Sequence, residues 1–119
     1  MKQPLQIIPV LPSADIARDV KWYEEFVGFE CVFADKMYAV LRRDNLKIHL
    51  QWHANTPDDP LLGGSVVRII VEDIRTFFDE FIQRKTVSPD KLCLDTPWQT
   101  HEFGFYDLNN NAIFFVEAV

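Results

Sequence analysis

Hydrophobic and polar positions repeat along the chain in two similar halves. The first half opens with a short apolar run at residues 5–11, in which Pro9 lacks an amide donor and favours a sheet edge or a bend. Asp15 can cap a following helix that ends at Gly28, because four apolar residues recur there at helical spacing: Ile16, Val20, Tyr23 and Val27. Strand-like segments follow at residues 29–34, 37–43 and 45–52. The first half thus predicts a strand, a helix and three strands.

The same order returns after a connector at residues 53–64, where prolines and glycines interrupt any periodicity. Residues 65–71 read as a strand and Asp73 as a second helix cap. The helix face that follows is apolar at Ile74, Phe77, Phe78 and Phe81. Further strands are predicted at residues 91–95, 101–107 and 111–118, the last two joined by a tight turn from Asp107 to Asn111.

This duplication predicts an α+β fold built from two βαβββ modules in a single domain, residues 1–119. The modules span about residues 1–54 and 63–119, on either side of the connector. One module cannot bury both faces of its own sheet, so we expect the two copies to form one curved mixed sheet with the helices outside. The central cleft of that sheet is the expected functional site.

Composition and charge narrow the possible partners. The chain has 18 acidic and 12 basic residues, and its net charge of -6 opposes binding to a phosphate backbone, so nucleic acid is not an expected partner. No segment approaches the roughly 20 apolar residues that cross a bilayer, so no membrane partner is expected. Cys31 and Cys93 have no metal-type spacing, and we expect two buried, reduced thiols in a cytoplasmic protein.

Several short motifs resemble one known family. They are Pro9-Val10-Leu11 before the first helix, Asp15 seven residues before Trp22-Tyr23, Gly28-Phe29, Pro97-Trp98, Glu102-Phe103, and the turn from Asp107 to Asn111. Together they resemble the glyoxalase/bleomycin resistance protein/dioxygenase superfamily, also called vicinal oxygen chelate, and its bleomycin-resistance branch in particular. The resemblance spans nearly the whole chain and implies a homodimer in which two protomers complete each cleft and share or exchange the strand that holds Pro9.

The resemblance also implies where a metal would bind. Enzymes of this superfamily take metal ligands from four inward-facing strand positions, which fall here on Ile8, His49, Val66 and Phe114. Only His49 carries a donor atom, and one imidazole cannot supply the three or four protein ligands of a zinc or non-haem iron site. We therefore predict no metal, no cofactor and no catalytic residue of the usual kind.

The candidate ligand-binding residues combine strand alternation with the resemblance. Alternation places Gln51 and Arg68 beside the vacant metal positions, and the resemblance implies that Phe33, Tyr38 and Trp98 flank a ligand. The predicted set is Phe33, Tyr38, His49, Gln51, Arg68, Trp98, Phe103 and Phe114. His101 and Glu102 are adjacent in a predicted strand, so they should point to opposite faces.

Two functions of different classes remain open. The first is a metal-free binding protein that sequesters a flat or amphipathic small molecule, as in antibiotic resistance. The alternative is a glyoxalase- or dioxygenase-like enzyme that acts without the usual metal site. Arg68 and His49 leave the charge of the ligand open, because a buried guanidinium needs an acceptor from the protein or from the ligand.

Overall fold

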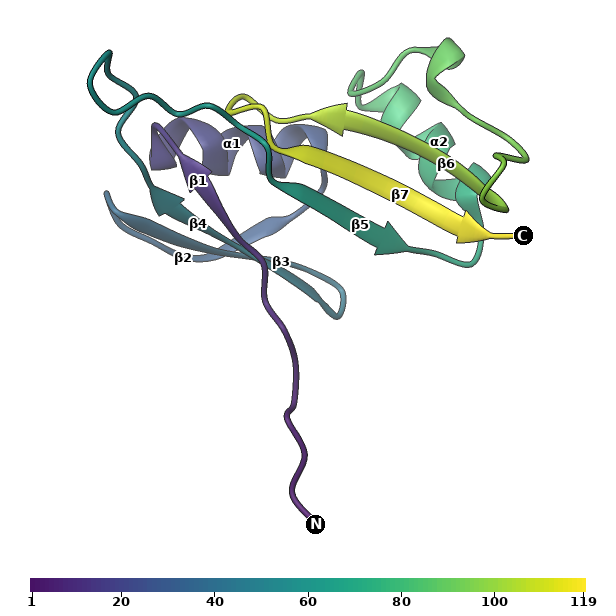
Figure 1. Ribbon diagram of the computed structural model, residues 1–119, viewed down its shortest axis with the longest axis horizontal. Helices are drawn as coiled ribbons and strands as arrows, with labels where there is room; N and C mark the ends of the chain where they lie inside the picture. Colours follow the sequence, from purple (N-terminus) through teal and green to yellow (C-terminus); the bar gives the residue numbers. More distant parts are fainter.

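The computed structural model describes all 119 residues, and its first half is a four-stranded sheet covered on one face by a helix (Figure 1). The elements are β1 (Val10–Ser13), α1 (Ile16–Phe26), β2 (Glu30–Ala34), β3 (Tyr38–Arg43) and β4 (Leu46–Trp52). The strand order is β1-β4-β3-β2. β1 runs parallel to β4, while the other neighbours are antiparallel. This is the predicted order of strand, helix and three strands.

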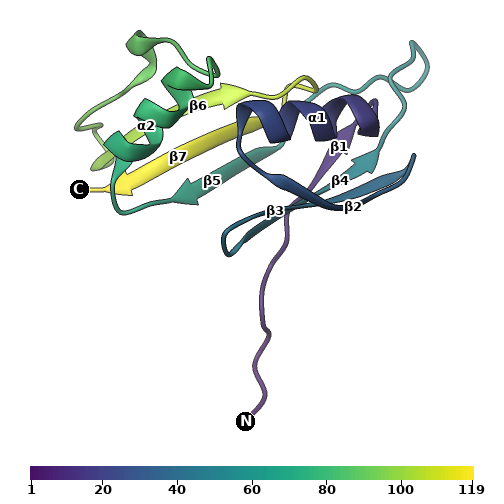
Figure 2. The same cartoon turned by 180° about the vertical axis from the view of Figure 1, so that it is seen from behind.

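The second half repeats the arrangement with one strand fewer. Its elements are β5 (Val66–Ile70), α2 (Ile74–Gln83), the 3-10 turn η1 (Pro89–Lys91), β6 (Thr100–Tyr106) and β7 (Ala112–Ala118). They form a separate three-stranded sheet in the order β5-β7-β6. The α+β class is therefore confirmed, but the expectation of one continuous sheet is wrong. The two helices lie on the same side of the molecule (Figures 1 and 2), which leaves the opposite faces of both sheets open.

The prediction of a strand at residues 91–95 is wrong. Pro89 begins a 3-10 turn there, and only Cys93 pairs with β6, through an isolated bridge to Glu102. The extended conformation ends at Asp95, whose φ of 51° is left-handed. Cys93 is exposed and Leu94 is 46% exposed, so burial does not stabilise a longer strand, and the expectation of two buried thiols is also wrong.

The predicted strand at residues 5–11 also begins later than expected. Regular pairing starts at Val10, and residues 1–9 extend away from the body as an arm (Figure 1). Pro4 and Pro9 cannot donate to a ladder, and nothing in the chain covers Leu5 or Ile7, which are 97% and 96% exposed. Apart from Pro9, whose carbonyl accepts a hydrogen bond from the backbone N–H of His49, the arm is thus a strand-like segment without a pairing partner in its own chain.

Both helices begin as their caps predict. The Asp15 carboxylate accepts a hydrogen bond from the backbone N–H of Arg18, and the Asp73 carboxylate accepts from those of Arg75 and Thr76. Neither helix is long and apolar enough to span a membrane. Gly28 follows α1 with a φ of 76°, and a Cβ at this position would lie 2.7 Å from the Arg84 guanidinium, so only glycine fits without a shift.

One hydrophobic core runs through both halves. Sixteen buried side chains form a single cluster between the two helices and the two sheets. Beneath α2 the rings of Phe103 and Phe115 stack with centroids 5.5 Å apart, and Phe81 packs on both. Trp22 and Tyr23 pack on the core side of α1, as predicted.

A buried polar network joins the halves at the turn from Asp107 to Asn111. The Tyr23 hydroxyl donates to the Asp107 carboxylate at 2.6 Å, and the Asn109 side-chain amide donates to Asp19 at 2.7 Å. Burial and the charge of Asp107 raise the pKa of Tyr23, which keeps its hydroxyl protonated and able to donate. The turn therefore fixes the two halves together as well as the register of β6 and β7.

A second connection between the halves centres on Glu80 of α2. Arg43 of β3 donates to both carboxylate oxygens of Glu80, at 2.7 and 2.5 Å. It also donates to the backbone carbonyl of Val27, the residue that follows α1, at 2.8 Å. The Arg43 guanidinium lies 5.4 Å from the centroid of the Phe77 ring. The hydrogen bonds from Arg43 lower the pKa of Glu80, outweighing its burial, which alone would raise it.

This geometry predicts a pH-dependent loss of stability on removing the Glu80 charge. Because the folded pKa is lowered, the contribution of Glu80 is complete above its ordinary value of 4.5 and disappears as the pH falls below it. At pH 7 the free energy of unfolding of the Glu80→Gln variant, measured with urea, should be about 1.5–3 kcal/mol lower than that of the parent. This difference should become smaller towards about pH 3. Asp79→Asn, an exposed position on the same helix, is the matched control. A difference between Glu80→Gln and the parent that does not change with pH would contradict this account.

Candidate functional site

The open face of the first sheet gathers half of the predicted ligand-binding residues. Strand register places Tyr38 opposite Gln51, and Val40 opposite both His49 and Phe33, so these side chains lie on the face turned away from α1. We call this the first open face, defined by Phe33, Tyr38, His49 and Gln51. The Phe33 ring is 54% exposed.

Tyr38 and His49 form one unit on the first open face. The Tyr38 hydroxyl lies 2.7 Å from His49 Nδ1, and the two rings meet edge to face with centroids 5.3 Å apart. The hydrogen bond fixes the direction of the imidazole and leaves its Nε2 for another partner. This pair combines aromatic surface with one directed polar atom.

The open face of the second sheet carries three of the other four predicted residues, Arg68, Trp98 and Phe114. We call it the second open face, defined by Arg68, Trp98, Glu102 and Phe114. Arg68 lies opposite Phe114, with its guanidinium 5.6 Å from the centroid of that ring. Gly104 makes room for the Phe114 ring, because a Cβ there would lie 2.5 Å from it.

Glu102 connects the polar groups of the second open face, and residue patterns alone did not single it out as a site residue. Its Oε2 accepts from Trp98 Nε1 at 3.0 Å, Thr100 Oγ1 at 2.7 Å and Arg68 Nη2 at 3.1 Å. Burial alone would raise the pKa of Glu102, but these three hydrogen bonds outweigh it and the pKa is lowered. The carboxylate therefore stays charged. The only signal for Glu102 in the sequence was its place in the Glu102-Phe103 motif.

Phe103 does not belong to either open face, so its prediction as a ligand-binding residue is wrong. Its side chain is 1% exposed and packs under α2 with Phe78 and Phe81. Alternation along β6 gives the reason, since Glu102 and Gly104 point to the open side and Phe103 to the helix side. His101 points to the helix side as well, where its Nδ1 accepts from the backbone N–H of Asp95 at 3.0 Å. His101 and Glu102 therefore point to opposite faces of the sheet, as predicted.

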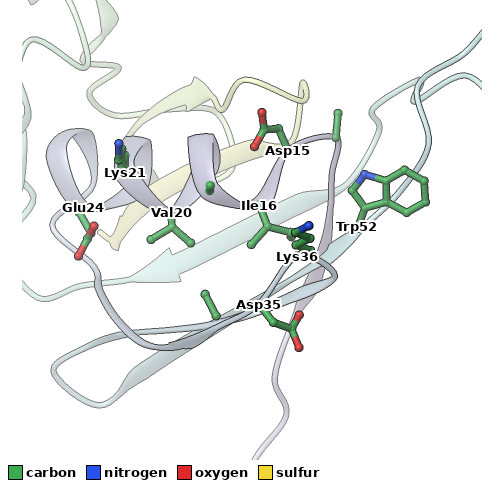
Figure 3. A pocket seen from close by; sticks show the side chains of 11 residues that line it. Asp15, Ile16, Val20, Lys21, Glu24, Asp35, Lys36 and Trp52 are labelled. Atoms are coloured by element: carbon green, nitrogen blue, oxygen red, sulfur yellow. The ribbon is translucent and has the colours of Figure 1, made fainter.

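Phe114 and Arg68 line two separate hollows, so the predicted residues of the second open face do not share one pocket. Phe114 lines a hollow of about 420 Å³ beside β6, together with Gly104 and Tyr106. Arg68 lines another of about 380 Å³, where Lys47 and the arm residue Gln6 lie between the two sheets. The largest hollow, about 660 Å³, lies on the helix side between α1 and the β2–β3 hairpin, with Val20 in its floor and Trp52 at one end (Figure 3). It contains none of the predicted site residues.

The donor set does not fit the metal centre of the superfamily's enzymes. Of the four ligand positions that the resemblance implies, three fall on Ile8, Val66 and Phe114, whose side chains carry no nitrogen, oxygen or sulfur. No three side chains of His, Cys, Asp or Glu in the chain are grouped so that they could hold a metal ion. The open faces offer aromatic rings, an imidazole and an Arg–Glu pair instead, which are groups that bind organic molecules.

Comparison with known proteins gives one consistent relationship. No family model matches the chain. Bleomycin resistance proteins of Geobacillus stearothermophilus and Staphylococcus aureus are 28% identical to it in an alignment of 129 positions, gaps included, which covers 97% of this chain and 98% of theirs.

The fold is shared with solved structures over the same extent. A bleomycin resistance determinant encoded on the transposon Tn5 superimposes with a TM-score of 0.80 at 20% identity, covering 97% of this chain and 98% of that one. The bleomycin-binding protein of bleomycin-producing Streptomyces verticillus, in complex with copper(II)-bleomycin, gives 0.78 at 21% identity with full coverage of both chains. A glyoxalase/bleomycin resistance protein/dioxygenase from Nocardioides gives 0.78 at 13% identity, covering 100% of this chain and 86% of that one. The chain thus shares its fold with bleomycin-binding proteins and resembles bleomycin resistance proteins in sequence over nearly its whole length.

Proposed function

We propose that this protein binds bleomycin or a similar flat, amphipathic small molecule and sequesters it without changing it chemically. The observation that carries the proposal is the similarity to bleomycin resistance proteins over 97% of the chain. The chemistry of the two open faces supports it, because exposed rings and a few directed polar atoms bind organic ligands without any need for a reactive group. The net charge of -6 favours ligands with cationic groups.

In this proposal each open face supplies a different part of the ligand's environment. Phe33 and Tyr38 provide ring surface on the first face, while His49 and Gln51 offer polar atoms beside them. Trp98 and Phe114 provide ring surface on the second face. Arg68 lies over the Phe114 ring and forms an ion pair with Glu102. Exposed aromatic side chains give a large contact area at a small entropic cost.

We further propose that the protein is a homodimer in which one face of each kind, from different protomers, forms each cleft. Two observations support a partner chain: the uncovered arm with Leu5 and Ile7, and the apolar side chains of the edge strand β5, where Val66 and Ile70 are 60% and 67% exposed. An apolar edge strand of this kind favours pairing with another chain. The arm of one protomer could cover that surface on its partner.

The dimer proposal predicts a molar mass of twice 13.9 kDa, about 28 kDa, by light scattering at micromolar concentration. Deleting residues 2–8 should shift the protein towards the monomer, because the deletion removes the exposed apolar side chains of Leu5 and Ile7. Replacing Gln3 with alanine in the same arm is the control and should leave the mass unchanged. A molar mass of about 14 kDa for the full-length protein, measured by light scattering, would contradict the dimer.

The experiment that separates binding from catalysis is recovery of the ligand. The protein is incubated with an equimolar amount of copper(II)-bleomycin, denatured and removed, and the ligand is analysed by mass spectrometry. Sequestration predicts full recovery of the ligand at an unchanged mass. A product of altered mass that accumulates with time would favour the enzymatic alternative.

A further inference from the structure

Glu102 is a buried carboxylate beneath two exposed side chains of the second open face. It is 6% exposed, whereas Trp98 is 62% exposed and the Arg68 side chain 42%. Its three hydrogen-bond donors come from different places: β5, the loop before β6, and the first residue of β6. A charged acceptor with three donors is held in one position and in turn holds the donors.

The loop that carries Trp98 has little else to orient the indole ring. Asp95 and Gln99 both have left-handed φ values, 51° and 65°, which are costly for residues other than glycine. Hydrogen bonds between Thr96 and Thr100 close the backbone of this loop. The indole N–H has one partner, Glu102, so that bond sets the direction in which the exposed ring points.

Glu102 also determines the charge of the second open face. The Arg68 guanidinium lies against the Phe114 ring, and its ion pair with Glu102 spans 3.1 Å. While Glu102 is charged, the pair is neutral as a whole. Without that charge the face would present an uncompensated guanidinium beside two aromatic rings, an arrangement that attracts planar anions.

We propose that Glu102 is a positioning and specificity-determining residue, which holds the Trp98 ring in its binding orientation and offsets Arg68 so that the face accepts cationic or neutral aromatic ligands and disfavours anions. The inference rests on the proposed binding function, since it assigns a ligand-charge preference to that site. The proposal gives Glu102 two roles, one in positioning the Trp98 ring and one in offsetting the charge of Arg68, and different substitutions remove them. Glu102→Gln keeps an acceptor oxygen but loses the charge, while Glu102→Leu loses both.

The positioning role can be tested without any ligand, by near-ultraviolet circular dichroism. Subtracting the spectrum of a Trp98→Phe variant from that of its parent isolates the Trp98 signal. This difference should persist in the Glu102→Gln background and fall to less than about half in Glu102→Leu, because only the leucine variant frees the ring. Equal Trp98 signals in all three backgrounds would overturn the positioning role.

The charge role is tested with two planar aromatic probes, ethidium as the cation and 8-anilinonaphthalene-1-sulfonate as the anion. Glu102→Gln should weaken ethidium binding about tenfold and strengthen binding of the anion several-fold. Adding Arg68→Gln to this variant should return the ratio of the two affinities to within about threefold of the parent, a rescue that a purely structural role does not give. Asp58→Asn, which removes the same charge from the exposed connector, is the control.

The possible outcomes are distinct. An unchanged affinity ratio in Glu102→Gln, or no rescue by the second substitution, would overturn the charge role. If neither probe binds the parent protein, the proposed binding function fails for this face, while circular dichroism still decides the positioning role. If Glu102→Leu does not fold, the near-isosteric Glu102→Gln and its rescue still decide the charge role.

Discussion

Replacing Asp107 with alanine is expected to lower the free energy of unfolding by about 3–5 kcal/mol. The carboxylate is 5% exposed and accepts from the Tyr23 hydroxyl, the Asn111 side-chain amide and the backbone N–H groups of Asn109 and Asn111. The alanine variant leaves all four donors buried without their acceptor. Urea denaturation followed by circular dichroism measures the loss.

Leu108→Ala is the matched control for this prediction, because Leu108 lies in the same turn but is 49% exposed. It should change stability by no more than about 0.5 kcal/mol. Tyr23→Phe removes one of the donors and should cost about 1–2 kcal/mol. A loss below about 1 kcal/mol in Asp107→Ala would mean that the turn does not join the two halves energetically.

Replacing Trp98 with alanine should weaken ligand binding by about 1–3 kcal/mol and leave the fold intact. The ring is mostly exposed in the free chain and has one hydrogen bond, so few packing contacts are lost from the folded state. A ligand that covers the ring would lose a large contact area. Titration of parent and variant with copper(II)-bleomycin, followed by calorimetry, gives the difference.

Leu62→Ala serves as the comparison, because Leu62 is an 83% exposed apolar residue in the connector and belongs to neither open face. It should bind the ligand like the parent. If Trp98→Ala unfolds, the ring contributes to the core in a way that its exposure does not indicate. If it binds as tightly as the parent, Trp98 lies outside the ligand site.

The parts of the fold that depend on local chemistry could be predicted from the sequence. Asp15 and Asp73 cap their helices because an aspartate carboxylate satisfies free N–H groups wherever it precedes an amphipathic segment. Apolar spacing located both helix faces, and strand alternation placed His101 and Glu102 on opposite sides. Motifs that combine such caps, turns and aromatic positions indicated the resemblance to bleomycin resistance proteins, and the comparisons find the same similarity.

The errors arose where a residue's role depends on distant parts of the chain. An apolar run such as residues 5–11 reads as a strand, but pairing needs a neighbour, and this chain offers none before Pro9. Phe103 is aromatic and lies on the strand that adjoins the Trp98 loop, which favours the ligand side, but alternation along β6 puts its side chain in the core. The network around Asp107 depends on a contact between residues 84 positions apart, which no local pattern reveals.

The central claim is that this chain binds a bleomycin-type ligand in a stoichiometric, metal-independent site. Isothermal titration of the full-length protein with copper(II)-bleomycin tests it most directly, with free copper(II) titrated as the control. The account predicts one ligand per chain, a dissociation constant at or below about 1 μM, and no matching signal from copper alone. No saturable heat with the complex up to about 1 mM, or equal binding of free copper(II), would contradict it.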